Sequence, residues 1–490
     1  MERNLSLLVD KYEFTMSQVY FSAGKKDEIA VFDAFFRKEP FGKGYGIMGG
    51  VENIIKFIKE IHFNKDDIDY LRSTDKFSEE FLNYLKDFKF TGNVYAILDG
   101  TPVFRGEPCV TVEAPIIEAQ IIETALLAYL NQGICFTTAA RRVVEAAGEI
   151  PVMEFGARRA MGPEAAVEAS YCSIVAGCSA TSNILAGKEK NLPVSGTFAH
   201  SFVTSFTTEF EAFKAYADVY PDNTVLLVDT YDVLKSGVPN AIKTAQYLRS
   251  RGYELKGIRI DSGDLAYLSK EAKKMFVEAG FPDVKICISN GLNERTIRSL
   301  KEQGAIIDSI GLGDNIVLPD HARVGCVYKL VAMKQKNKYD SRIKASNDAI
   351  KAINPGYKKV YRFFDQKTGY ALGDVIALYD ENIPKNGYTL IDPLDSNNTL
   401  SIENYFVREL QVPMILNGNV VYDFPTVFGK AEYCEKEMAT LYPEVKREEM
   451  PHQYYVDMTK KLLDLKKELL KLAKSQRVQY DVDMSLKKKL

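Results

Sequence analysis

The sequence predicts a mixed α/β protein with an irregular βα barrel at its centre. From about residue 150 onward, strand-like and helix-like segments alternate, and the later strands recur at the spacing of one βα unit. Several of these strands are apolar without alternation, as expected of strands buried on both faces. An open doubly wound sheet fits the same pattern. The number of successive units and the absence of a GxGxxG motif favour the barrel.

Two long apolar helices are expected first, at residues 116–130 and 137–147, and Gly148 ends the second. Strands then follow, most of them with a helix behind them. The strands are expected at residues 151–155, 194–198, 224–230, 256–261, 284–289 and 306–313. One helix is expected to begin at Pro163, and four more are expected at residues 207–219, 241–251, 266–279 and 294–303.

The two ends of the chain have a different character from the barrel region. The first 115 residues mix both element types, with helices expected at 5–23, 51–61 and 79–88 and strands at 29–36 and 93–98. Residues 357–364 and 370–378 predict a strand pair that returns to this N-terminal domain. We therefore expect an N-terminal domain at 1–115 completed by about 335–430, a barrel domain at 116–334 and a helical extension at 431–490.

The segment at residues 459–474 predicts an amphipathic helix. Its leucines Leu462, Leu465, Leu469 and Leu472 have heptad spacing. A basic amphipathic helix can also lie on a membrane. The segment spans only about two heptads, and acidic residues interrupt it, so we expect it to pack on its own protein or on a sister subunit.

The composition excludes several classes of protein. The 490 residues carry a net charge of −3, which gives no reason to expect binding to nucleic acid or to an anionic membrane. Four His and no Trp exclude a site of clustered histidines. Seven Cys without a CxxC pair predict reduced, mostly buried thiols in a cytoplasmic protein. No apolar window reaches the roughly 20 residues that a membrane span needs.

Unusual residues gather after the predicted barrel strands, on the rim where βα barrels have their active sites. Each loop alone has a structural explanation, as a turn, a solvated pair or a helix cap. Six such loops on one rim together favour a functional site. The residues concerned are Arg158, Arg159, His200, Asp229, Arg259, Asp261, Ser289, Asn290, Gly291, Gly311, Gly313 and Asp314.

These residue types suit phosphate chemistry. The small residues at 289–291 and 311–313 allow backbone N–H groups to approach an anion. Arg158 and Arg159 can form bidentate bonds to phosphate or carboxylate. Asp229 and Asp261 can hold Mg²⁺ or bond ribose hydroxyls. The substrate that these residues indicate is anionic, phosphorylated and sugar-bearing.

His200 lies among these loops, in the string GTFAHSFVTSF. A single His is more often a packed core residue. Its place after a predicted barrel strand favours a role in catalysis instead, as a base or as a nucleophile that accepts a phosphoryl group.

An ordered set of strings resembles the nicotinate phosphoribosyltransferase family. Most fall in the predicted barrel, and DKYEFTM and FFRKEPFG lie near the start of the chain. Together they cover about residues 7–332, and only the ordered set is specific. The barrel strings are EFGARRAMGPE, SGTFAHSFVTSF, LVDTYD, IRIDSGDL, ISNGLNE, GLGDN and GCVYKLVA.

The resemblance implies a reaction and a fold. Nicotinate and 5-phosphoribosyl 1-pyrophosphate would give nicotinate mononucleotide and pyrophosphate, with ATP hydrolysis driving the step in NAD salvage. The fold would be an irregular βα barrel with a second, sandwich-like α+β domain built from both chain ends. The working unit would be a homodimer with active sites at the subunit interface, and Mg²⁺ would accompany the pyrophosphate.

Residue by residue, the resemblance implies specific roles. His200 would be the autophosphorylated histidine. Phe155 and Tyr12 would enclose the pyridine ring, with Tyr12 coming from the partner subunit. Near nicotinate, the matching positions are Arg158, Thr197 and Arg259. At phosphate and ribose they are Arg159, Arg259 and Asp261. At the 5-phosphate they are Ser289, Asn290, Gly291, Gly311, Gly313 and Asp314. A carboxylate repels phosphate, so we expect Asp314 to use its backbone N–H.

Three alternative activities remain open at this point. Nicotinamide phosphoribosyltransferase tends to have Asp just after the Thr of a GT motif, and Phe198 in that place favours an acid substrate. Quinolinate phosphoribosyltransferases are shorter and lack the AHS motif. A Schiff-base lyase would need a Lys after a barrel strand, and the motif loops contain none. From a different class, the chain would be an inactive barrel that acts as a sensor or scaffold.

Overall fold

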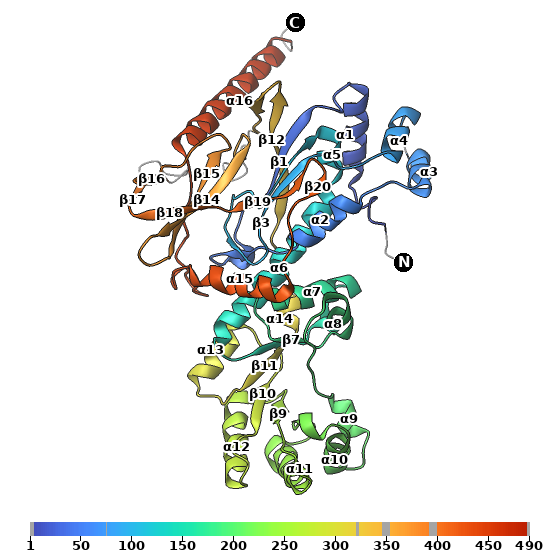
Figure 1. Ribbon diagram of the computed structural model, residues 1–490, viewed down its shortest axis with the longest axis vertical. Coiled ribbons are helices and arrows are strands. Elements are labelled where there is room, and N and C mark those ends of the chain that lie inside the picture. The colour runs from blue at the N-terminus through green and yellow to red at the C-terminus, as the bar shows by residue number, and fades with distance from the viewer. Residues whose placement is uncertain (1–3, 75, 320–322, 345–352, 392–398, 488–490) are drawn as a thin grey trace. The chain divides into compact units, whose positions relative to one another are not determined.

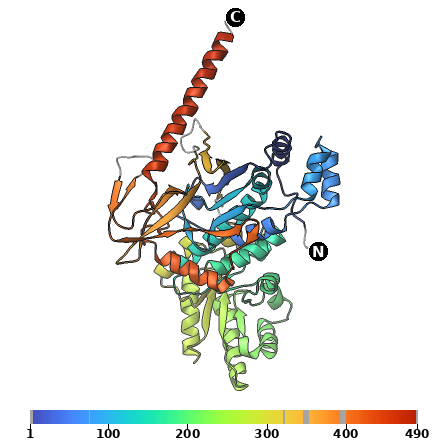
Figure 2. The ribbon, with the colours of Figure 1, turned by 45° about the horizontal axis from the view of Figure 1, so that its top comes forward.

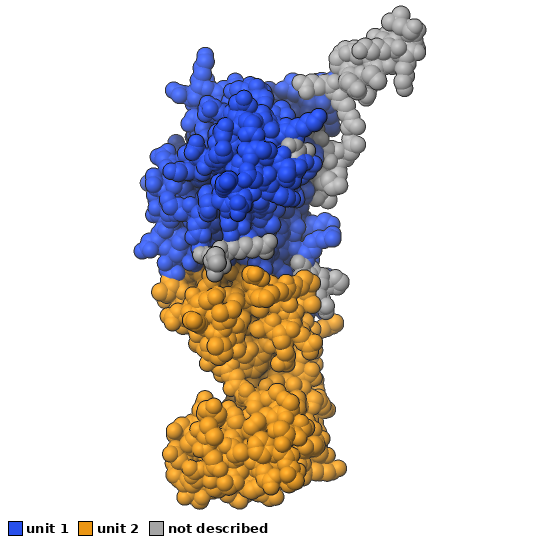
Figure 3. Space-filling model, turned by 90° about the vertical axis from the view of Figure 1, so that its right-hand side faces the viewer, with its two compact units in different colours: residues 1–135, 323–425, 436–490 blue, residues 136–322, 426–435 orange. Residues whose placement is uncertain are grey.

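The computed structural model describes the 490-residue chain except residues 1–3, 75, 320–322, 345–352, 392–398 and 488–490, and it describes residues 476–487 by their backbone only. The chain forms two compact units, coloured in Figure 3. Unit 1 contains residues 1–135, 323–425 and 436–490, and unit 2 contains residues 136–322 and 426–435. Unit 1 thus gathers both ends of the chain.

The main sheet of unit 1 is antiparallel and pairs N-terminal strands with strands from beyond residue 325 (Figure 1). Its interior strand β1 (Ile29–Phe36) has the predicted bounds and is buried along almost its whole length. The order is β13-β12-β1-β5-β3-β19-β20. The other strands are β3 (Asn93–Ile97), β5 (Val110–Pro115), β12 (Cys326–Gln335), β13 (Lys338–Ser341), β19 (Gln411–Leu416) and β20 (Asn419–Val420).

Short helices accompany this sheet, and several of them bury one apolar side. In α2 (Val51–Glu60), for example, Val51, Ile54, Ile55 and Ile58 are buried at helical spacing. The others are α1 (Lys11–Ser22), the 3-10 turn η1 (Pro40–Gly42), α3 (Lys65–Thr74), α4 (Glu79–Lys86) and α5 (Ile116–Ile121). A small pair of strands, β2 (Gly46–Ile47) and β4 (Pro102–Val103), lies between them in the chain.

Two predicted helix boundaries in this region were wrong. The first helix starts at Lys11 rather than residue 5, because residues 5–9 form hydrogen-bonded turns instead. The two helices expected at 116–130 and 137–147 are divided at Ile122, and α6 (Glu123–Ala147) continues through residues 131–136. Gly133 sits inside α6 because the backbone of Gly49 lies so close that a Cβ would be 2.2 Å from its carbonyl carbon.

The predicted strand pair is confirmed as β14 (Lys358–Asp365) and β15 (Ala371–Leu378), but these strands form a separate sheet of unit 1. Its order is β18-β14-β15-β21, with β18 (Tyr405–Glu409) and β21 (Val456–Met458). Two further strands, β16 (Tyr388–Ile391) and β17 (Thr399–Ile402), pair with one another.

The C-terminal helix α16 (Lys460–Lys487) begins against β15 (Figures 1 and 2). Leu462 and Leu463 pack with Ile376 and Met458. Burial then decreases along the predicted heptad, since Leu465 and Leu469 are half-buried and Leu472 is 51% exposed.

Two buried ion pairs hold unit 1 together. Lys358 Nζ lies 2.8 Å from Asp33 Oδ2, and both side chains are 1% exposed. The pair joins β14 of the smaller sheet to β1 of the main sheet. Arg362 forms two bonds to Asp374, of 2.8 and 2.6 Å, and donates to the carbonyl of Pro102 at 2.9 Å.

Aromatic rings enclose the second of these pairs. The Arg362 guanidinium carbon lies 5.5 Å from the ring centroid of Phe104 and 5.6 Å from that of Tyr454. The Tyr454 hydroxyl donates to Asp374 Oδ1 at 2.9 Å. Burial, followed by the charge of Asp374, raises the pKa of nearby Glu107 well above its usual range. The raised pKa of Glu107 favours its protonated form beside the Arg362–Asp374 pair.

Unit 2 contains a parallel sheet in the order β7-β6-β11-β10-β9-β8, which confirms the mixed α/β class and the parallel sheet. Five of its strands lie within the predicted strand segments. The strands are β6 (Val152–Glu154), β7 (Ala180–Thr181), β8 (Val225–Leu227), β9 (Gly257–Ile260), β10 (Lys285–Ile288) and β11 (Ser309–Leu312).

The helices of unit 2 alternate with these strands along the chain. The principal ones are α7 (Pro163–Val175), α8 (Ile184–Lys190), α9 (His200–Thr204), α10 (Glu209–Val219), α11 (Val238–Ser250), α12 (Leu265–Glu278), α13 (Glu294–Glu302), α14 (Asp314–Val317) and α15 (Val427–Ala439). Short turns of 3-10 or π type are η2 (Ala157–Arg159), η3 (Pro221–Asn223) and η4 (Val233–Gly237).

The last of these strands in the chain, β11, pairs with the first, β6, so the order of the strands in the sheet is a cyclic version of their order in the chain. The edge strands of the sheet are β7 and β8. The predicted strand at residues 194–198 was wrong, since among these residues only Val194 forms a bridge, to Thr181. Ser195 and Gly196 are exposed, so the segment lacks the burial that stabilises a parallel strand. The short strand β7 pairs with β6 instead.

The Arg362 cluster leads to a prediction about stability. Replacing Arg362 with Met should lower the free energy of unfolding of unit 1 by about 3–5 kcal/mol, because Asp374 would remain buried without its cation. Urea titration followed by circular dichroism measures this change. The control is Arg72→Met, which removes an exposed arginine paired with Asp69 and Glu79 and should have little effect. Equal effects of the two changes would contradict the prediction.

Candidate functional site

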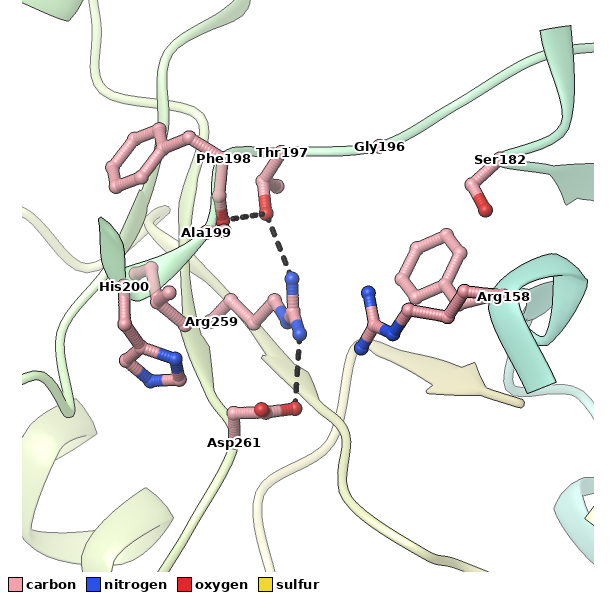
Figure 4. A pocket seen from close by; sticks show the side chains of 11 residues that line it. Arg158, Ser182, Gly196, Thr197, Phe198, Ala199, His200, Arg259 and Asp261 are labelled. Carbon is pink, nitrogen blue, oxygen red and sulfur yellow. Dashed lines mark hydrogen bonds and ion pairs between the residues drawn. The ribbon is translucent and has the colours of Figure 1, made fainter. Parts of the chain in front are cut away.

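The residues after the parallel strands of unit 2 surround a cavity of about 180 Å³ (Figure 4). They come from the ends of β6, β7, β8 and β9 and from the irregular segment before α9. Six predicted site residues are among them. The lining consists of Phe155, Arg158, Ser182, Gly196, Thr197, Phe198, Ala199, His200, Leu227, Arg259 and Asp261.

Arg259 is the centre of a hydrogen-bond network at this cavity. Its guanidinium donates to Asp261 Oδ1 at 2.9 Å, to Ser289 Oγ at 2.8 Å and to Thr197 Oγ1 at 3.1 Å. Arg259 and Asp261 belong to the same strand end, whereas Ser289 follows the neighbouring strand β10. These bonds fix the guanidinium plane at the cavity wall.

The charge state of Asp261 follows from the same network. Burial alone would raise the pKa of its carboxyl group, but the hydrogen bonds from Ser289 and Arg259 outweigh burial, and the pKa is lowered. Asp261 therefore stays ionised at neutral pH. The hydroxyl of Ser289 donates to Asp261 Oδ1 and is 3% exposed as a residue, so its side chain is already engaged.

His200 is oriented by a buried carboxylate. Its Nε2 lies 3.1 Å from Asp229 Oδ1, and Ser262 Oγ donates to Asp229 Oδ2 at 2.6 Å. The Asp229 side chain is 1% exposed, whereas the His200 side chain is 44% exposed. A bond from Nε2–H to Asp229 leaves the lone pair on Nδ1, so the exposed ring presents Nδ1 as its nucleophilic atom. The sequence did not predict that Asp229 contacts His200.

Glycines shape the wall beside Phe155. A Cβ on Gly311 would lie 2.4 Å from the Phe155 ring, so only Gly leaves room for the ring there. A Cβ on Gly313 would lie 3.0 Å from the Phe155 carbonyl oxygen, and one on Gly156 would lie 2.7 Å from the Gly313 carbonyl oxygen. Steric room for Phe155 is thus a structural reason for glycine at both positions.

The two predicted arginines of the turn η2 differ in their surroundings. Arg158 lines the cavity and extends toward the side of Arg259 (Figure 4). Arg159 Nε lies 3.3 Å from Asp314 Oδ1, and both side chains are more than half exposed. Arg159 therefore neutralises the carboxylate of Asp314, at the start of the short helix α14.

The loop after β10 has an unusual backbone. Asn290 has φ = 106° and Gly291 has φ = 35°, and both residues are exposed. Asn315 Nδ2 donates to the carbonyls of Gly291 and Leu292 at 3.1 and 2.7 Å. A positive φ at Asn is uncommon and concentrates at functional loops.

Sequence reasoning missed Ser182. Ser182 follows β7, whose two residues are too few to show a strand pattern in the sequence. The ring of Phe198 packs against Phe202 and Tyr216, with centroids 5.0 and 4.7 Å away, and points away from the cavity (Figure 4). Tyr12, another predicted site residue, lies on α1 of unit 1 and is 44% exposed.

Other sequence predictions concern metals, thiols and membranes. No three His, Cys, Asp or Glu side chains converge as a metal site within the residues that the structure describes. All seven Cys residues are buried, and burial raises the pKa of Cys135 and Cys326 to about 12. Of the helices in the described part of the chain, none is long and apolar enough to cross a membrane.

Comparisons with known proteins cover almost the whole chain. The description "Nicotinate phosphoribosyltransferase (NAPRTase) family" matches residues 150–346. The descriptions of its N-terminal and C-terminal domains match residues 7–131 and 357–466. These segments contain every predicted site residue.

Relatives from distant organisms agree. The chain is 39% identical to nicotinate phosphoribosyltransferase of Bacillus subtilis over 93% of both chains, and 35% identical to nicotinate phosphoribosyltransferase 1 of Arabidopsis thaliana over 94% of this chain and 92% of that one. The crystal structure of human nicotinic acid phosphoribosyltransferase aligns with a TM-score of 0.84 at 28% identity, over 94% of this chain and 99% of that one. The chain belongs to the nicotinate phosphoribosyltransferase family.

Proposed function

We propose that the unit 2 cavity binds nicotinate and joins it to 5-phosphoribosyl 1-pyrophosphate, giving nicotinate mononucleotide and pyrophosphate. The family relation gives the chain this enzymatic activity. The roles of its individual residues are our inference from the geometry.

The observation that supports this most strongly is that Arg158, Arg259 and Phe155 line one small cavity, with the Arg259 guanidinium carbon 5.7 Å from the centroid of the Phe155 ring. A pyridine ring can stack on Phe155 while its carboxylate accepts from a guanidinium. Asp261, the acid among the lining residues, is already bonded to Arg259. The charge that remains for a ligand is therefore positive, which suits the nicotinate anion better than the neutral amide.

The chemistry needs positioning more than a covalent nucleophile. The pyridine nitrogen attacks the anomeric carbon as the bond to pyrophosphate breaks, through a state with oxocarbenium character. We assign the 5-phosphate to the loops at Asn290–Gly291 and Gly311–Gly313. The Ser289 hydroxyl is engaged by Asp261, so backbone N–H groups and the exposed Asn290 side chain would bind the phosphate there. Arg159 would offset the charge of Asp314 beside it.

We assign the ATP-dependent step to His200. Its Nδ1 attacks the γ-phosphorus of ATP, ADP leaves, and water later hydrolyses the phosphohistidine. Asp229 fixes the tautomer and stabilises the charge that develops on the ring. Phosphorylation at Nδ1 follows from this geometry, because Nε2 faces the carboxylate.

Mg²⁺ is the proposed companion of the pyrophosphate, whose charge it would neutralise. Both oxygens of Asp229 are already bonded, to His200 and Ser262. Arg259 and Ser289 both donate to Oδ1 of Asp261, so Oδ2 is left to bind a ligand. Asp261 therefore fits a magnesium ligand better than Asp229.

Several larger features complete the proposal. The parallel strands β6 to β11 would form an irregular barrel, and the main and smaller sheets of unit 1 would form the sandwich-like domain. A homodimer would supply Tyr12 from the partner subunit to the pyridine ring. Tyr12 is 44% exposed, and this exposure of a large aromatic residue supports the assignment.

An assay with separate substrates tests the function. The purified chain receives 5-phosphoribosyl 1-pyrophosphate, Mg²⁺ and ATP together with nicotinate, nicotinamide or quinolinate. We expect mononucleotide from nicotinate at a rate at least tenfold above that from the other two, because a missing or extra carboxylate leaves charges unpaired. The proposal would be overturned if nicotinamide were the one acceptor of the three that gave product, or if none of them gave product.

Variants of His200 and Asp229 test the ATP-dependent step. His200→Ala should retain the fold but lose transfer of phosphate from γ-labelled ATP and the coupling of ATP hydrolysis to synthesis. Asp229→Asn should slow that transfer by about 10–100-fold, because a charge-assisted bond is lost. NMR should find the transferred phosphate on Nδ1 of His200. Asp232→Asn is the control, since Asp232 only caps the turn η4. Full coupled activity of His200→Ala would contradict this role.

A double-mutant cycle tests the contact between Phe155 and Gly311. Gly311→Ala should push the ring from its place and raise the KM for nicotinate by about tenfold, whereas Phe155→Ala creates room for the new methyl group. The added effect of Gly311→Ala should therefore be small in the Phe155→Ala background. Steady-state kinetics of the four forms measure the coupling. Additive effects would show that Gly311 acts elsewhere, for example through its N–H on phosphate.

A further inference from the structure

Glu154 is a buried carboxylate beneath the nicotinate cavity that the mechanism does not use. It is the last residue of β6 and is 0% exposed. Within the described residues no Lys, Arg or His forms an ion pair with it. A buried charge without a cation is costly unless donors surround it. Glu154 therefore needs a structural or functional explanation.

Three donors from three different elements satisfy this carboxylate. The N–H of Gly156 donates to Oε1. The hydroxyls of Ser170 and Thr181 donate to Oε2 at 3.0 and 2.6 Å. Gly156 belongs to the turn after β6, Ser170 to α7 and Thr181 to β7. One carboxylate thus connects a turn, a helix and a strand end.

The connected segments carry neighbouring parts of the cavity wall. The bond to Gly156 holds the turn between Phe155 and Arg158. The bond to Thr181 holds the residue before Ser182, and the Ser182 N–H donates to the Glu154 carbonyl at 2.9 Å. Figure 4 shows Ser182 on the same side of the cavity as Arg158. The placement of these residues relative to one another therefore depends on this buried residue.

We propose that Glu154 is a positioning residue that fixes the wall of the nicotinate subsite formed by Phe155, Arg158 and Ser182 and does not touch the substrate. This inference rests on the proposed function of the cavity. Glu154 holds the turn that carries Phe155 and Arg158 and the strand end before Ser182, so its loss affects the binding of the pyridine acid. The proposed 5-phosphate loop at Asn290–Gly291 receives no bond from Glu154 and should be affected far less.

The conservative variant Glu154→Gln has a defined consequence. Its amide oxygen can still accept from Gly156, but the amide nitrogen meets the two hydroxyls, which must then turn to accept. Ser170 can do so by donating to the Ala166 carbonyl, 2.9 Å away. The variant should therefore fold, while the connection of the turn after β6 to α7 and to the end of β7 becomes weaker.

A matched pair on α7 isolates this effect. Ser170 and Ser173 are both 0% exposed, and each hydroxyl lies within hydrogen-bond distance of the carbonyl four residues earlier, at 2.9 and 2.7 Å. Of the two, only the Ser170 hydroxyl can direct its single proton to Glu154 instead. Ser170→Ala and Ser173→Ala therefore remove the same buried hydroxyl, but only the first change reaches the carboxylate.

Steady-state kinetics with both substrates test the proposal. Glu154→Gln should raise the KM for nicotinate by about tenfold, and Ser170→Ala should raise it by about threefold. Neither change should alter the KM for 5-phosphoribosyl 1-pyrophosphate by more than about twofold, and Ser173→Ala should alter neither KM. Melting curves confirm that each variant is folded.

Three outcomes would overturn the role of Glu154. The KM for nicotinate could be unchanged in Glu154→Gln, the KM values of both substrates could rise together, or Ser170→Ala and Ser173→Ala could behave alike. Each of these presupposes an active wild-type enzyme. A wild-type chain that does not convert nicotinate would instead defeat the proposed function, so the two failures are distinct. If Glu154→Gln does not fold, the Ser170 and Ser173 pair still decides the question.

Discussion

The site depends on carboxylates at the ends of parallel strands, each satisfied by side chains from neighbouring segments. Glu154 after β6 receives three donors, Asp229 after β8 receives His200 and Ser262, and Asp261 after β9 receives Arg259 and Ser289. An ionised carboxylate without such donors would be costly in these half-buried or buried places. Satisfying the carboxylates therefore fixes the loops relative to one another, and the cavity is the space that these fixed loops enclose.

The three carboxylates have different effects because their partners differ. Asp229 acts on an imidazole, so it controls which ring nitrogen is available. Asp261 acts on a guanidinium and keeps its plane at the wall, while its own charge is maintained by Arg259 and Ser289. Glu154 has only neutral donors and joins the turn after β6 to α7 and β7. One residue type thus orients an imidazole, anchors an arginine and connects neighbouring segments.

Unit 1 shows how distant parts of the chain come to depend on one another. The strands β12 and β19 pair with β1 and β3, and Lys358 bonds to Asp33 across more than 300 residues of sequence. The Arg362 cluster adds Tyr454 from near the C-terminus. Because these groups are charged and buried, neither end of the chain can leave without exposing or isolating a charge. This explains why unit 1 forms from three separated stretches.

The sequence by itself determined most of the strands and helices of unit 2, the strand ends that line the cavity and the family. It did so because buried parallel strands have continuous apolar runs, and because the unusual residues follow the strand ends. It failed at residues 194–198, where burial rather than local pattern decides whether a strand forms, and at Gly133, where the close approach of the Gly49 backbone accounts for a glycine inside a continuous helix. Only the tertiary structure decided that Asp229 faces His200, that Gly311 makes room for Phe155 and that Ser182 reaches the cavity. These contacts join residues about 30 to 160 positions apart, and no local pattern in a chain encodes a distance across such separations.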